Sequence, residues 1–168
     1  FKSVNLYVSN LSVMNIISAI IKNFRCFENA ELNFELLTTL IGENGTGKTA
    51  ILEAINFAFS PTFLASRINE QDFHNACEDS IEIQVFLDES FIVNLSDGYT
   101  MRPIPCDKIY LNIKRRERAS PSKALSEPFT ITHYAIPDDT VPSDEPNKWH
   151  ISRNTGTEFK FTERSLFF

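Results

Sequence analysis

The sequence predicts an α/β fold in which a sheet around one loop-and-helix unit is joined to an antiparallel β subdomain. Three observations predict it. A glycine-rich octet, residues 42–49, lies between a short apolar run and a helical pattern. From residue 81 onward apolar residues recur with a period of two, which is typical of half-buried strands. The balance of 42 % hydrophobic and 23 % charged residues in 168 residues is that of one globular domain.

Residues 1–13 precede the first methionine, Met14, and we expect them to be an extension or tag-like segment. The alternative is an extra strand, because apolar residues alternate within them. They lack the basic start and the unbroken apolar stretch of a signal peptide. No apolar run approaches the roughly 18 residues that a membrane span needs. We therefore expect a cytoplasmic domain over residues 14–168, with no membrane partner.

Three strands are expected before the octet. Residues 16–22 form an isoleucine-rich run typical of a buried strand, and residues 31–35 alternate like its half-exposed partner. Residues 23–29 form a turn-like link between the two. Residues 37–41 predict a second buried strand, which runs directly into the octet.

A helix is expected after the octet. Ile51, Leu52, Ile55 and Phe59 recur at helical spacing, and the alanines between them favour a helix. The helix should end before Pro61, because proline restricts the residue before it and cannot continue the hydrogen-bond ladder.

The rest of the chain predicts an irregular or partly helical connection, residues 62–79, followed by an antiparallel meander. Its strands are expected at residues 81–87, 91–95, 109–113 and 129–135, with turns at 88–90 and 96–98 and a proline-rich loop over 137–147.

The octet fits the pattern G-x-x-x-x-G-K-[ST] in full, and a chance match in a chain of this length is on the order of 1 %. Its glycines let the backbone approach phosphate oxygens, and successive N–H groups then form an anion nest at a helix N-terminus. Lys48 would bring an ammonium to the β- and γ-phosphates, and Thr49 a hydroxyl to Mg²⁺. The alternative is a glycine-rich turn that only caps the helix. The expected nucleotide-binding residues are Gly42, Asn44, Gly45, Thr46, Gly47, Lys48 and Thr49, with Lys48 as the catalytic residue and Thr49 as the magnesium ligand.

Two stretches of residues 17–59, IKNFRCFENAELNF and LIGENGTGKTAILEAINFAF, resemble the N-terminal lobe of the RecF/SMC-type ABC ATPases. The stretch DFHNACEDSIEIQVFLD, residues 72–88, is similar to the OLD-family ATP-dependent nucleases. The resemblance implies a P-loop NTPase fold, the N-terminal lobe of an ABC-type or AAA-type head. It also implies that Arg25, in the N-F-R-x-F link, contacts the nucleotide, so Arg25→Ala should weaken ATP binding with little change in the melting temperature of the ligand-free chain.

The same resemblance implies parts that have no match here. No apolar run ends in Walker B acids, no Ser-Gly-Gly signature occurs, and no histidine has a switch context. The acids of residues 86–90 resemble a turn. Neither Gln71 nor Gln84 has the context of the family's magnesium ligand, and Asp72 is a weak substitute. We therefore expect the chain to be the first lobe of a longer protein, able to bind ATP but unable to hydrolyse it alone.

The function implied is an ATP- and Mg²⁺-binding lobe of a DNA-associated ATPase, with heads that pair as a homodimer or higher oligomer around nucleotide. The first hypothesis is the ATPase part of an OLD-like endonuclease in bacterial defence against phage, by analogy alone. One alternative is the head of a DNA repair or chromosome-organising protein. Another is a small-molecule P-loop kinase, which the long meander disfavours because such kinases alternate strands and helices.

Other candidate groups carry little chemistry. The formal charge of −6 excludes a basic surface for nucleic acid. Residues 114–118 form a short basic cluster that indicates either a DNA contact or, more simply, a solvated hairpin end. The three histidines and the three cysteines have no metal-ligand spacing. We expect the histidines to be structural and the cysteines to be reduced core residues.

Overall fold

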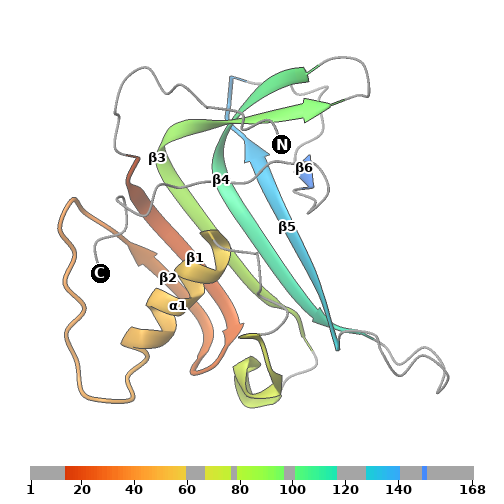
Figure 1. Cartoon of the computed structure of the whole chain (residues 1–168). Coiled ribbons are helices and arrows are strands. Elements are labelled where there is room, and N and C mark those ends of the chain that lie inside the picture. Colours follow the sequence, from red (N-terminus) through yellow and green to blue (C-terminus); the bar gives the residue numbers. More distant parts are fainter. Residues whose placement is uncertain are drawn as a thin grey trace, which may run out of the picture.

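The computed structural model describes residues 14–59, 67–76, 79–96, 101–116, 128–140 and 149–150. Six strands form one antiparallel sheet in the order β2-β1-β3-β4-β5-β6, and one helix crosses a face of it (Figure 1). The elements are β1 (Ile16–Phe24), β2 (Phe27–Asn33), α1 (Lys48–Phe59), η1 (Glu70–Asp72), η2 (His74–Ala76), β3 (Ile81–Ser96), β4 (Met101–Arg115), β5 (Phe129–Pro137) and β6 (Trp149–His150). The expected extension, residues 1–13, lies outside the described residues.

The link expected at residues 23–29, called the N-terminal link, is a tight hairpin turn between β1 and β2, closed by the pair Phe24 and Phe27. Asn23 and Arg25 have φ values of 55° and 51°, a left-handed conformation that few residues other than glycine adopt. The Asn23 side chain donates to the Ser80 carbonyl at 3.1 Å, a contact with the residue just before β3. The predicted first strand is confirmed, and its partner starts earlier than residue 31 because the turn is shorter than expected.

The two strands expected at residues 81–87 and 91–95 form one long strand, β3. The prediction of a turn at residues 88–90 is therefore wrong. The pairing of β3 with β4 shifts between Phe86 and Phe91, which marks an irregularity in the ladder instead of a chain reversal. Asp88 at this point accepts hydrogen bonds from the backbone N–H and the side chain of Asn15, at 2.7 and 2.8 Å. A partner 73 residues away thus outweighs the local turn tendency.

The strand expected at residues 37–41 is not formed, and most of its side chains are exposed. Leu37 and Ile41, with the preceding Leu36, are 87, 90 and 92 % exposed, whereas Leu40 is partly buried against the core. Residues 34–43 contain neither helix nor strand, and Figure 1 shows this connection leaving the sheet between β2 and α1. A strand needs a neighbour for its N–H and C=O groups, and no described strand lies beside this segment.

The core lies between α1 and the sheet. The helix starts at Lys48 and buries a continuous face that includes Ile51, Ile55 and Phe57. The Phe57 ring packs edge-on against Phe24 of β1, with ring centroids 5.9 Å apart. Leu52, expected on the core face, is 38 % exposed. This packing fixes the direction of α1, and so the place of the loop before it.

The observed fold therefore combines the helix α1 with one antiparallel sheet. The expected sheet and the antiparallel β subdomain joined to it are both represented among the described residues, and their strands form a single sheet. The meander itself is confirmed by β3, β4 and β5.

Candidate functional site

The octet at residues 42–49, called the phosphate loop from here on, is shaped by two glycines in the left-handed region. Gly45 has a φ of 87° and Gly47 a φ of 95°. A Cβ added at Gly45 would meet nothing within 4 Å, whereas one at Gly47 would lie 2.5 Å from Cζ of Phe27 and 2.7 Å from Sγ of Cys26. The loop is thus open on the Gly45 side and pressed against the β1–β2 turn at Gly47, which explains the need for glycine at both positions.

Lys48 points back across the loop that precedes it. Its ammonium donates to the carbonyl oxygens of Gly42 and Glu43, each at 2.6 Å, and to the Thr46 hydroxyl at 3.3 Å. The Thr46 hydroxyl in turn donates to the Glu43 carbonyl at 2.9 Å. All these acceptors are neutral, so none of these contacts pairs the ammonium with a carboxylate. An anion placed here would meet a cation that needs little rearrangement.

A hollow of about 270 Å³ lies over the N-terminus of α1. It brings the octet together with the N-terminal link, which is far from it in sequence. The lining residues are Arg25, Cys26, Asn44, Gly45, Gly47, Lys48, Thr49 and Ala50. Of the expected residues, Gly42 and Thr46 lie in the loop but not in this lining. Thr49 is exposed in the first turn of α1, so its hydroxyl is accessible to a ligand.

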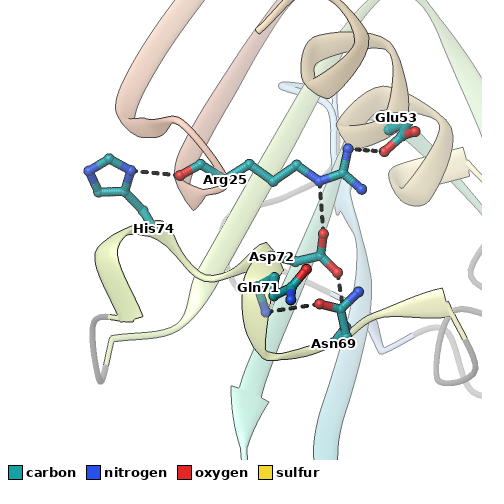
Figure 2. Close-up of polar contacts among 6 residues, drawn as sticks. All are labelled: Arg25, Glu53, Asn69, Gln71, Asp72 and His74. Atoms are coloured by element: carbon teal, nitrogen blue, oxygen red, sulfur yellow. Dashed lines mark hydrogen bonds and ion pairs between the residues drawn. The ribbon is translucent and has the colours of Figure 1, made fainter. Parts of the chain in front are cut away.

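Arg25 connects three parts of the chain (Figure 2). Its Nε donates to Oδ1 of Asp72 at 2.8 Å, and its Nη1 forms an ion pair with Glu53 of α1. Its backbone N–H donates to the Asp72 carbonyl at 2.8 Å, and its own carbonyl lies 2.8 Å from Nδ1 of His74. The guanidinium also lies 5.1 Å from the centroid of the Phe24 ring. The predicted Arg25 is therefore at the hollow, held by contacts that the sequence pattern did not indicate.

The charge of Arg25 is strongly supported. Partial burial works against the cation, but the hydrogen bond and the charge of Asp72, followed by those of Glu53, outweigh it. Together they raise the pKa of the guanidinium above its ordinary value. The hollow thus holds two permanent cations, Arg25 and Lys48, beside the positive end of a helix whose first turn contains no acidic residue.

Asp72 is the residue that sequence reasoning placed differently. Its side chain is 3 % exposed, and both carboxylate oxygens are used: Oδ1 by Arg25 and Oδ2 by the backbone N–H of Asn69 at 2.9 Å. It therefore holds Arg25 and offers no open magnesium ligand. A sequence signal was available, since Asn69 followed three residues later by Asp72 is a capping-box spacing.

The remaining candidates are structural or peripheral. Cys106 is buried as expected, and burial, with Asp138 and Asp107 nearby, raises the pKa of its thiol to about 12. Cys26 is exposed at the hollow, so its assignment to the core is wrong, and Cys77 lies outside the described residues. Among the described residues, no group of three or more His, Cys, Asp or Glu could hold a metal ion.

The basic cluster is partly neutralised by the fold. Nε of Arg115 lies 2.8 Å from a carboxylate oxygen of Glu70, and the guanidinium lies 3.9 Å from the centroid of the Phe73 ring. Lys114 and Arg116 are exposed, and the rest of the cluster lies outside the described residues. This arrangement favours the hairpin-end interpretation over a built DNA contact.

Comparison with known proteins decides the family. A family model described as "AAA ATPase domain" matches residues 14–166. The chain belongs to this ATPase-domain family. The family is one of P-loop NTPases, which implies that the domain binds ATP. No helix within the described part of the chain has the length and apolarity needed to cross a membrane.

The chain is also similar to proteins named "DNA replication and repair protein RecF" from Francisella tularensis. Those from subspecies novicida (strain U112), tularensis (strain SCHU S4 / Schu 4) and holarctica (strain LVS) are each 36 % identical over 92 residues. The aligned part is 54 % of this chain and 24 % of each relative. The resemblance to the RecF/SMC-type lobe is thus supported in its general form. The chain covers about a quarter of the length of these relatives.

Proposed function

We propose that the phosphate loop and Arg25 bind ATP with Mg²⁺, and that the chain is the nucleotide-binding lobe of a DNA-associated ATPase of the repair or chromosome-organising type. One observation carries the proposal. Lys48, the N-terminus of α1 and Arg25 line a single hollow. Two fixed cations and a helix N-terminus form an environment suited to a polyphosphate.

The residues present fit ATP and its metal. The open face at Gly45 leaves room for phosphate oxygens near the backbone, and Lys48 contacts only neutral groups that phosphate can replace. Thr49 offers its hydroxyl to Mg²⁺, which would neutralise part of the phosphate charge. Arg25 suits the nucleotide because a guanidinium binds phosphate in a fork and stacks on a base.

The DNA repair alternative has more support than the nuclease. The similar proteins named above carry the words "DNA replication and repair" in their names, whereas OLD-like nuclease activity and defence against phage rest on the sequence resemblance alone. The kinase alternative is disfavoured by the fold, because the described strands are all antiparallel with no strand–helix–strand repeat. Contact with DNA is proposed for the full-length protein, since a net charge of −6 does not favour it in this chain.

The exposed segment between β2 and the loop supports the idea of a second lobe. Leu36, Leu37 and Ile41 present a large apolar surface in six residues, which a soluble protein normally covers. We propose that a further lobe covers this segment and that two heads pair around nucleotide, as the family resemblance implies. The Walker B acids, the signature motif and the switch histidine would then come from that lobe and from the paired head.

The proposal is tested by calorimetry of Mg²⁺–ATP binding to the 168-residue chain and to Lys48→Ala. Loss of a charge-assisted contact should weaken binding by about 1.5–3 kcal/mol, or roughly 10- to 150-fold. Lys114→Ala, the same change at an exposed site in β4, is the matched control and should bind as the parent does. Equal affinities of the parent and Lys48→Ala would refute the assignment.

A phosphate-release assay tests whether this chain hydrolyses ATP alone. We expect binding without turnover, because Glu53 and Asp72, the two carboxylates paired with Arg25, are engaged by its guanidinium. Loss of groups that stabilise the transferred phosphoryl typically slows the reaction by about 10³–10⁵. Turnover that Lys48→Ala abolishes would show that this chain holds the complete machinery.

A further inference from the structure

Arg25 has an uncommon backbone conformation that needs support from its surroundings. Its φ of 51° is in the left-handed region, which residues with a Cβ occupy only when the structure holds them there. Asp72 provides much of that support, since its carbonyl accepts the Arg25 N–H at 2.8 Å and its carboxylate accepts the Arg25 Nε at 2.8 Å. The same residue thus fixes both the backbone and the side chain of Arg25, and Figure 2 shows the side-chain contact.

Asp72 is itself fixed independently of any ligand. Its second carboxylate oxygen accepts the backbone N–H of Asn69, while the Asn69 side chain accepts the N–H of Gln71 at 2.8 Å. These reciprocal bonds cap η1, and a bridge between Phe24 and Phe73 joins this segment to β1. A side chain that is 3 % exposed and bonded at both carboxylate oxygens cannot turn to follow a mobile arginine. Arg25 must instead take the position that Asp72 sets.

Glu53 holds the other side of the guanidinium in a weaker manner. Its side chain is 33 % exposed, and it forms an ion pair with Nη1 alone. Asp72 uses Nε, which leaves Nη2 without a partner among the described residues. Because Arg25 and Lys48 both line the hollow, we expect Nη2 to be the nitrogen that meets a ligand there.

We propose that Asp72 is a positioning residue for nucleotide binding: it holds Arg25 in the hollow in the orientation that meets the phosphates or base of ATP. The inference rests on the proposed function of the hollow. The positioning role and simple electrostatics predict opposite changes in ATP affinity when the charge of Asp72 is removed. Removing a negative charge close to an anion site should strengthen ATP binding through Coulomb's law alone, whereas loss of the positioning contact should weaken it.

The test compares Mg²⁺–ATP affinity of the 168-residue chain with Asp72→Asn, Glu53→Gln, Arg25→Ala and the double variant Arg25→Ala/Asp72→Asn. Asp72→Asn should bind at least about fivefold more weakly, because a group 1 Å out of place loses most of a charge-assisted bond. Glu53→Gln makes the same charge change on the less buried partner and should lose less. In the Arg25→Ala background, Asp72→Asn should have no further effect, because it acts through Arg25.

Affinity of Asp72→Asn equal to or higher than that of the parent would overturn the proposal, as would an equal loss in both backgrounds, which indicates a general structural effect. If the parent fails to bind ATP, the proposed function fails and the positioning role with it. If the parent binds, Lys48→Ala does not, and Asp72→Asn binds normally, only the positioning role is wrong.

A measurement on the unmodified chain covers the case in which Asp72→Asn does not fold. The Nε–H proton of Arg25 should give a resolved NMR signal, identified by its loss in Arg25→Ala, that exchanges slowly with solvent. It should persist when Mg²⁺–ATP is added, since nucleotide is expected at the other end of the guanidinium. A signal that exchanges rapidly, or that disappears on saturation with nucleotide, would contradict a fixed Arg25.

Discussion

Replacing Gly47 by alanine tests the contact between the phosphate loop and the β1–β2 turn. Two costs can be worked out from the structure. Alanine at a φ of 95° is strained by about 1–2 kcal/mol. Its Cβ would also lie 2.5 Å from Phe27 and 2.7 Å from Cys26, and such overpacking costs about 1–3 kcal/mol. Gly47→Ala should therefore lose about 2–5 kcal/mol of stability.

Gly45→Ala is the matched control. It has nearly the same backbone strain, with a φ of 87°, but its Cβ would meet nothing within 4 Å. It should lose only the backbone part, about 1–2 kcal/mol. The difference between the variants, about 1–3 kcal/mol, measures the close approach to Phe27 and Cys26.

Equilibrium urea unfolding followed by circular dichroism measures both losses. Phe27→Leu serves as the background in which the steric part should shrink, because the ring that meets the new Cβ is gone. Gly47→Ala and Gly45→Ala that agree within about 0.5 kcal/mol would refute the reasoning, since the only structural difference between them is that contact.

Three further predictions follow from other contacts. Mg²⁺–ATP should slow alkylation of the Cys26 thiol, which is exposed at the hollow, and peptide mass spectrometry would detect this. The hydrogen bond from Ser90, with help from Thr140, lowers the pKa of Asp138. That stabilisation is present above the unfolded value of about 3.9 and is lost as the pH falls through the lowered pKa. Ser90→Ala should therefore reduce the urea midpoint at pH 7 but not below the lowered pKa. Arg25→Ala should lower stability even without ligand, by about 1–3 kcal/mol, because it leaves Oδ1 of the buried Asp72 without its donor. An unchanged melting temperature of the ligand-free variant would contradict this and agree with the expectation drawn from the family resemblance.

The sequence predicted those features that depend on local pattern. The octet and the helix that starts at Lys48 follow from residue types at fixed spacing, and the alternation in β5 follows from burial of one sheet face. The single strand β3 could not be predicted, because the pairing of Asn15 with Asp88 joins residues that are 73 positions apart. Local turn preference at residues 88–90 is weaker than that long-range contact.

The residues of the candidate site also divide into those recognisable from a local motif and those that depend on distant partners. Lys48 and its loop could be proposed as a site because the motif lies within one octet, and Arg25 because it matches the N-F-R-x-F link of the resembled family. The role of Asp72 depends on a partner 47 residues away, which no spacing along the chain displays. The prediction of a strand at residues 37–41 was wrong because it relied on local pattern alone. The pattern is that of a buried strand, but burial requires a neighbour that the described residues do not supply.

The exposed connection between β2 and α1 also bears on how the chain tolerates a break. Its backbone at residues 34–43 is in neither helix nor strand, and such exposed stretches are where proteases nick a fold. After a cut near Leu37, β1 would remain hydrogen-bonded between β2 and β3, while α1 would remain packed on the sheet through Phe57. The two fragments should therefore stay associated, and the same position should accept new chain ends in a circular permutation.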